Sequence, residues 1–119
     1  MVSLLKLRLA NPKYLVDLGG IGSLSYIREE KDGKIAIGAM TPYADVKESS
    51  LLQRLCPILP KAAAVVGDVQ IRNRGTFGGA VAHADPAGDV PAAVLALRAD
   101  VKVTGPKGER WINVEDFFL

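Results

Sequence analysis

The sequence predicts an α+β domain with a mostly antiparallel sheet and flanking helices. Two extended runs each close on a glycine-containing turn, which is the pattern of a β-hairpin. Segments with helix-capping residues and helix-breaking prolines lie between them. Hairpins and helices alternate without the regular strand–helix–strand rhythm of a parallel sheet, and 119 residues suit one domain.

The chain opens with an apolar stretch that Asn11-Pro12 interrupts, since a proline disfavours helical backbone in the residue before it. The following "YLVDL" (Tyr14 to Leu18) is short, apolar and partly β-branched, so it predicts a buried strand. The next residues, "GGIG", predict a loop. The first hairpin then turns at Asp32-Gly33, a pair suited to positive φ angles.

Residues 41–67 predict two or more short helices. Thr41 is placed to cap the first helix with Pro42 at its first position, and Ser49 or Ser50 to cap a second. Pro57 and Pro60 are expected to divide the region.

Gly67 is expected to end that helical region. "DVPAAVLALRA" predicts a further helix that Asp89 can cap. A second hairpin is expected around a turn at residues 105–108, with Val101 and Val103 facing inward.

Composition excludes several classes of function. The formal net charge is +2, and the basic clusters are too short and lack interleaved aromatic residues, so we expect no nucleic-acid binding. Cys56 is the single cysteine; it predicts a buried apolar thiol and no protein-made metal site. No apolar run approaches the roughly 20 residues of a membrane span. We expect a cytoplasmic protein.

The stretch "RNRGTFGGAVAHADPAGD" carries the strongest functional signal. Gly78-Gly79 lets the backbone approach a ligand and turn N–H donors toward the oxygens of a phosphate. Thr76 offers a hydroxyl donor, and Arg72 and Arg74 precede it. These donors together predict a cradle for a nucleotide.

Simpler interpretations stand beside this one. The glycine pair also suits a plain tight turn. Asp89 can accept hydrogen bonds from sugar hydroxyls or merely cap a helix. His83 has no second ligand within metal-binding spacing, and no nucleophile–base pair or Walker loop is present. The residues alone therefore predict a possible nucleotide site without catalytic groups.

The run "GDVQIRNRGTFGGAVAHADPAGDVPAAVLALRADVKVTGPKGER" resembles the FAD-binding subunit of the molybdenum hydroxylases, which include carbon monoxide dehydrogenase (its medium subunit) and xanthine dehydrogenase. The resemblance extends over essentially the whole chain. It implies FAD as the cofactor and the second of the family's two glycine-pair motifs as the contact with the pyrophosphate. Ala80 departs from that motif, because relatives place a polar residue there. The residues that the resemblance assigns to FAD are Thr76, Phe77, Gly78, Gly79, Ala80, Asp89 and Val66.

The resemblance also implies a domain arrangement. Residues 1–119 correspond to a single FAD-binding subdomain, the middle one of the family, without the N-terminal subdomain and the C-terminal domain. The implied partners are a molybdenum-cofactor subunit, an iron–sulfur subunit and a chain that supplies the other half of the FAD site. Electrons would pass from iron–sulfur clusters through FAD to an acceptor, with no activity in this chain alone. The alternative is a scaffold module that keeps the fold but does not retain FAD. Under either hypothesis we expect an exposed apolar face and self-association.

Overall fold

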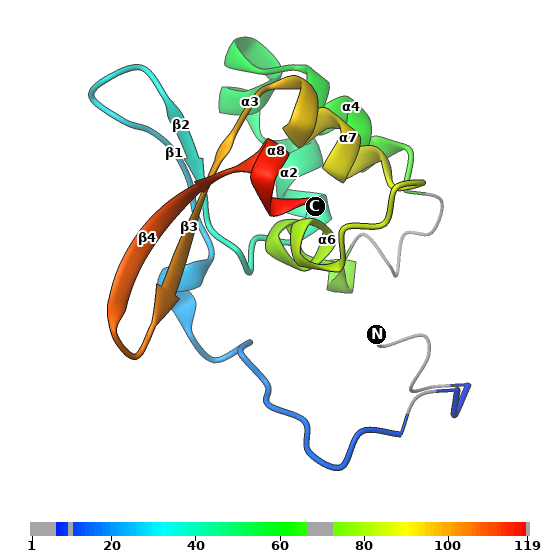
Figure 1. Ribbon diagram of the computed structural model, residues 1–119. Coiled ribbons are helices and arrows are strands. Elements are labelled where there is room, and N and C mark those ends of the chain that lie inside the picture. The colour runs from blue at the N-terminus through cyan, green and yellow to red at the C-terminus, as the bar shows by residue number, and fades with distance from the viewer. Residues whose placement is uncertain (1–6, 10, 67–72, 119) are drawn as a thin grey trace.

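The computed structural model describes residues 7–9, 11–66 and 73–118 of the chain. Two antiparallel hairpins lie on one side of the molecule, and most of the helices lie on the other (Figure 1). This arrangement confirms the predicted α+β class. In chain order the elements are η1 (Gly22–Leu24), β1 (Ile27–Glu29), β2 (Ile35–Ile37), α2 (Tyr43–Glu48), α3 (Ser50–Leu55), α4 (Ile58–Ala64), α6 (Phe77–His83), α7 (Asp89–Ala96), β3 (Asp100–Gly105), β4 (Gly108–Asn113) and α8 (Val114–Phe117).

The first hairpin forms where the sequence predicts it. Strands β1 and β2 pair with Ile27 opposite Ile37. Of the predicted turn pair, only Gly33 has a left-handed φ, of 82°. The Asp32 carboxylate instead accepts a hydrogen bond from the Lys34 N–H at 3.0 Å, which stabilises the turn.

The second hairpin is confirmed as well. Strands β3 and β4 pair from Asp100 opposite Asn113 to Gly105 opposite Gly108, which places the turn at residues 105–108. Val101 packs against the hydrophobic core, whereas Trp111 on the other face is 67% exposed. Within the described residues the two hairpins remain separate two-stranded sheets rather than one larger sheet.

The helix boundaries confirm some predicted signals and correct others. The Ser49 hydroxyl caps α3 by accepting from the Leu52 N–H at 3.2 Å. Thr41 does not cap α2, because that helix begins one residue later, with Pro42 at its N-cap. Pro57 separates α3 from α4, but Pro60 lies in the first turn of α4, where a missing N–H costs nothing. Gly67 lies outside the described residues.

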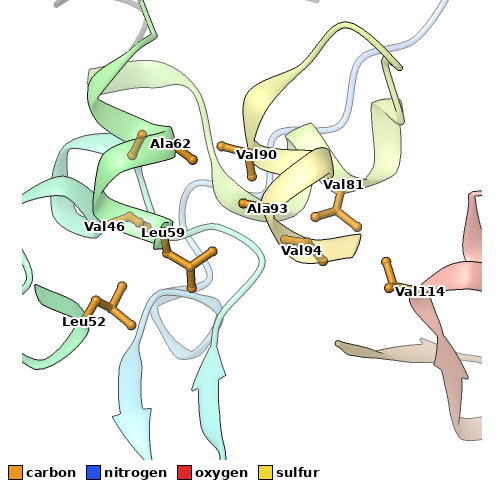
Figure 2. Close-up of a cluster of buried hydrophobic side chains, with 10 residues drawn as sticks. Val46, Leu52, Leu59, Ala62, Val81, Val90, Ala93, Val94 and Val114 are labelled. Atoms are coloured by element: carbon orange, nitrogen blue, oxygen red, sulfur yellow. The ribbon is translucent and has the colours of Figure 1, made fainter. Parts of the chain in front are cut away.

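The core sits between the helices and the inner faces of the hairpins. Side chains from α2, α3 and α4 face those of α6, α7 and α8 (Figure 2). Ile27, Ile35 and Ile37 of the first hairpin pack against this cluster. Most of the cluster consists of small or β-branched side chains, so the helices approach one another closely. The buried apolar residues are Val46, Leu52, Leu59, Ala62, Ala63, Val81, Val90, Ala93, Val94 and Val114.

The predicted buried strand at Tyr14 to Leu18 is wrong. Every residue of the N-terminal segment (residues 11–21) is exposed, and Val16 is 80% exposed. Figure 1 shows most of this segment running below the helices before it leads into η1. Its backbone hydrogen bonds in the described part are local, as between the Ile21 N–H and the Leu18 carbonyl at 3.0 Å. An apolar run becomes a strand only when a partner strand pairs with its backbone, and no strand of the described residues pairs with this one.

Candidate functional site

The glycine segment (residues 75–80) contains the start of α6, and Thr76 within it caps that helix. Thr76 has extended backbone, with φ −115° and ψ 153°, and stands at the N-cap of the helix. Its hydroxyl oxygen accepts a hydrogen bond from the Gly79 N–H at 3.2 Å. The Thr76 carbonyl accepts from the Ala80 N–H at 3.1 Å, so the first turn is fully formed.

The same segment is bonded to the residues that follow the first hairpin. The Gly78 N–H donates to the Ala39 carbonyl and the Phe77 N–H to the Thr41 carbonyl, each at 2.8 Å. In the opposite direction the Tyr43 N–H donates to the Gly75 carbonyl at 3.0 Å. The glycine segment is therefore held in place from two sides, by α6 itself and by the connection between β2 and α2.

These bonds change the predicted role of the glycine pair. The sequence predicts N–H groups turned toward a ligand, but the N–H groups of residues 77–80 all donate to acceptors within the chain. The acceptors of the Phe77 and Gly78 N–H groups, Thr41 and Ala39, are far away in the sequence, so the motif alone does not reveal them, whereas Gly79 and Ala80 donate to Thr76. The backbone of the segment is thus a rigid support rather than a ready set of free donors.

The two glycines differ in what their missing side chains allow. A Cβ at Gly78 would lie 2.6 Å from Ala39 Cα, well inside any real contact distance. A Cβ at Gly79 would meet only the Thr76 hydroxyl, at 2.7 Å, and this residue is exposed. Gly78 is therefore required for packing, whereas Gly79 leaves an uncovered stretch of backbone at the surface. The Phe77 side chain packs against the core.

Asp89 lies apart from the glycine segment, on the helix that packs against α6. The predicted capping role is wrong: the N-cap of α7 is Gly88, and Asp89 is the first helical residue. Its carboxylate is exposed, and no hydrogen bond or ion pair within the described residues engages it. It can contribute to α7 only as a negative charge near the helix N-terminus.

A shallow groove of about 360 Å³ runs between α4 and α7 and includes Asp89. Lys61 and Val65 line the same groove, and the half-buried Val66 follows directly after Val65. The predicted site residues thus fall into two groups, the glycine segment and the region around this groove. The remaining lining residues are Ile58, Ala62, Ala92 and Ala93.

Sequence reasoning missed two contributors to the site. Thr41 and Ala39 hold the glycine segment through their carbonyls, a role that any residue type can fill and that leaves no trace in composition. Arg74, one of the predicted donors beside Thr76, is exposed and has no ion pair in the described part of the chain. Arg72 lies outside the described residues.

Burial shifts the pKa of two side chains among the described residues, Cys56 and Tyr43. Burial raises the pKa of the Cys56 thiol, which is the opposite of what a reactive thiolate requires. Cys56 is half-buried rather than fully buried. Burial also raises the pKa of the Tyr43 hydroxyl. No group of three or more metal-binding side chains occurs in residues 7–9, 11–66 and 73–118. None of the helices in these ranges is long and apolar enough to cross a membrane.

Comparison with known proteins defines the class of this chain. A family model for the FAD binding domain in molybdopterin dehydrogenase matches residues 1–119. The chain therefore belongs to the FAD-binding domains of the molybdopterin dehydrogenases, as the resemblance in the sequence predicts.

Individual relatives narrow the comparison. The chain is 41% identical over 119 residues to the carbon monoxide dehydrogenase medium chain of Hydrogenophaga pseudoflava and covers 41% of its length. It is 36% identical over 118 residues to the glyceraldehyde dehydrogenase medium chain of Sulfolobus acidocaldarius, covering 99% of this chain and 42% of the relative. The chain thus spans about two fifths of the relatives it matches.

Solved structures agree with this class. The fold matches a carbon monoxide dehydrogenase from Hydrogenophaga pseudoflava that lacks the Mo-pyranopterin moiety of the molybdenum cofactor, with a TM-score of 0.91 and 42% identity over 99% of this chain and 41% of the other. It also matches quinoline 2-oxidoreductase from Pseudomonas putida 86, with a TM-score of 0.88 and 35% identity over 97% of this chain and 40% of the other. The two hairpins and the helices between them are therefore the family's arrangement.

Proposed function

We propose that this chain forms the FAD-binding portion of a molybdenum hydroxylase of the carbon monoxide dehydrogenase type and works in electron transfer. The observation that carries the proposal is the match of the FAD-binding family to all 119 residues, supported by the fold. The proposed partners are a molybdenum-cofactor subunit and an iron–sulfur subunit. Because the chain spans two fifths of its relatives, residues beyond this region would complete the FAD site. We also propose that the protein is cytoplasmic, as the sequence predicts.

Polar groups at the surface of the site fit the polar part of FAD. Thr76 uses its hydroxyl oxygen as an acceptor within the chain, which leaves its O–H proton to donate to a phosphate oxygen. Arg74, two residues earlier, supplies positive charge that no carboxylate in the described residues neutralises. Exposed Gly79 lets a ligand approach the backbone closely. Asp89 would accept hydrogen bonds from sugar hydroxyls, and Val66 would pack against an apolar part of the cofactor.

FAD, once bound, supplies the redox chemistry by accepting and passing on electrons. The protein's part is to hold the cofactor and exclude water. No side chain of the site is proposed as an acid or base. We propose that the chain has no activity without its partner subunits.

The alternative is a scaffold module that keeps the fold without retaining FAD. One observation favours it: the N–H groups of residues 77–80 already have acceptors within the chain, so these four do not form a free main-chain cradle. Ala80, which brings no polar side chain where relatives have one, points the same way. Under this alternative, FAD binding requires the remainder of a family protein.

A titration with FAD tests the proposal. Flavin fluorescence of the purified chain is followed in the wild type, in Gly79→Asp and in the matched control Gly20→Asp. Gly20 is also exposed, and an added Cβ there has no neighbour within 4 Å. The aspartate at position 79 places a negative charge where phosphate would bind, so we expect a dissociation constant at least about tenfold higher, equal to about 1.4 kcal/mol.

The control variant is expected to bind FAD like the wild type. If both variants weaken binding equally, the glycine segment is not the site. If the wild type binds no FAD at tens of micromolar protein, the scaffold alternative holds for this chain. Circular dichroism of each variant verifies that the fold is retained.

A further inference from the structure

Thr41 joins the first hairpin to the glycine segment from a buried position. The residue is 2% exposed. The hydroxyl oxygen accepts a hydrogen bond from the Tyr26 N–H and donates one to the Tyr26 carbonyl, both at 3.1 Å. Tyr26 directly precedes β1, so the hydroxyl of Thr41 is bonded to the base of the first hairpin.

The main chain around the same residue carries the glycine segment. The Thr41 carbonyl accepts from the Phe77 N–H, and the Ala39 carbonyl, two residues earlier, accepts from the Gly78 N–H. The Thr41 N–H donates to the Gly38 carbonyl at 3.1 Å, which fixes the local turn. One short stretch of backbone therefore receives both N–H groups that place Phe77 and Gly78.

Of these groups, only the Thr41 hydroxyl can be removed by a substitution, because the carbonyls belong to the main chain. Valine has nearly the same shape as threonine but cannot bond to Tyr26. The Tyr26 N–H would then lose its acceptor, whereas the Tyr26 carbonyl would keep the Gly38 N–H at 2.9 Å. The carbonyls of Ala39 and Thr41 would then be fixed relative to β1 only through the neighbouring bonds of the Gly38 and Met40 N–H groups, to Tyr26 and Leu24, so the glycine segment would lose part of its support.

We propose that Thr41 is a positioning residue for the FAD site: its buried hydroxyl fixes the backbone that holds Phe77 and Gly78. The inference rests on the proposed function in that it assigns Thr41 a part in FAD affinity. Thr41 touches the cofactor site only through the glycine segment. Its effect on the geometry of that segment exists in the FAD-free chain as well.

Hydrogen exchange in the FAD-free chain tests the positioning directly. We compare the wild type with Thr41→Val, Thr41→Ser and Ser49→Ala. The last variant removes the capping hydroxyl of α3, so it also loses one hydrogen bond but does so away from the glycine segment. Thr41→Val should lower the protection of the Phe77 and Gly78 N–H groups about tenfold, as expected for one lost hydrogen bond. Thr41→Ser should restore it, and Ser49→Ala should leave the ratio of these two amides to the core amides unchanged.

FAD titration of the same variants measures the functional effect. We expect the dissociation constant of Thr41→Val to rise about tenfold, equal to about 1.4 kcal/mol, and that of Thr41→Ser to stay near the wild type. Equal losses in Thr41→Val and Ser49→Ala would mean that Thr41 acts only through global stability, which overturns the inference. If the wild type binds no FAD, the proposed function fails for this chain, while the exchange experiment still decides the role of Thr41.

A second measurement covers the case in which Thr41→Val does not fold. Hydrogen exchange of the wild type at rising urea concentration reports which amides open together. The N–H groups of Tyr26, Phe77 and Gly78 should open as one unit if Thr41 couples them. Opening of Tyr26 at a lower urea concentration than the other two would contradict the inference.

Discussion

The two Gly-Gly pairs of this chain, Gly19-Gly20 and Gly78-Gly79, differ in what surrounds them. Gly19-Gly20 belongs to the exposed N-terminal segment, and a Cβ added at Gly20 would have no neighbour within 4 Å. Gly78-Gly79 begins α6, and a Cβ at Gly78 would collide with Ala39. The comparison teaches that a Gly-Gly pair in a sequence does not by itself indicate a close contact. Gly78 is packed against a distant part of the chain, whereas Gly19-Gly20 belongs to a local turn.

The largest expected effect separates the two pairs directly. Gly78→Ala should lower the free energy of unfolding by about 3 kcal/mol, because Ala39 backbone atoms cannot give way as a flexible side chain would. The gain of up to about 1 kcal/mol from the better helix propensity of alanine does not offset the collision. Gly20→Ala should change the stability by less than about 0.5 kcal/mol. Urea unfolding of both variants measures the difference, and similar values for the two would refute it.

An intermediate effect on stability is expected when the Thr76 hydroxyl, which caps α6, is removed. Thr76→Val removes the acceptor of the Gly79 N–H and should cost about 1 kcal/mol of stability, as typical N-cap losses do. Thr76→Ser keeps the oxygen and should remain within a few tenths of a kcal/mol of the wild type. Thermal unfolding of the two variants side by side provides the measurement. A serine variant as unstable as the valine variant would show that the γ-methyl, not the cap, matters.

The smallest effect on stability is expected in the N-terminal segment. Leu15 and Val16 are 68% and 80% exposed, so replacing both with serine should change the free energy of unfolding by less than about 0.5 kcal/mol. The same change should reduce self-association, because it removes apolar surface that the chain leaves uncovered. Sedimentation equilibrium at several concentrations measures the association of both proteins. A wild type that stays monomeric at all of these concentrations would contradict the predicted self-association.

Local signals in the sequence predict local structure well here. The glycine turns at Gly33 and at residues 105–108, the Ser49 cap and the break at Pro57 all depend on neighbouring residues, and each is confirmed. The prediction that fails is one that depends on a distant part of the chain. "YLVDL" has the residues of a strand, but strand formation depends on a second strand that its own sequence does not specify.

The same limit applies to the candidate site. The motif around Gly78 identifies the segment and the family, as the family match confirms. It does not reveal that the N–H groups of Phe77 and Gly78 are already bonded to residues 41 and 39, since carbonyl acceptors exist at every residue. Asp89 follows the pattern of a cap but stands one position inside α7. That shift leaves its carboxylate free for another role, which position in the sequence alone does not decide.

The hydrogen bond between Phe77 and Thr41 is a contact of long sequence separation, and we expect it to form late in folding. It closes a loop that runs from residue 41 to residue 77, whereas both hairpins close over a few residues. Closing a loop of that length costs roughly 3 kcal/mol of chain entropy before the contact is made. We therefore expect the two hairpin turns to close before the glycine segment is placed. Cofactor binding would then report completed folding, and pulse-labelled exchange at Phe77 would show the order of these events.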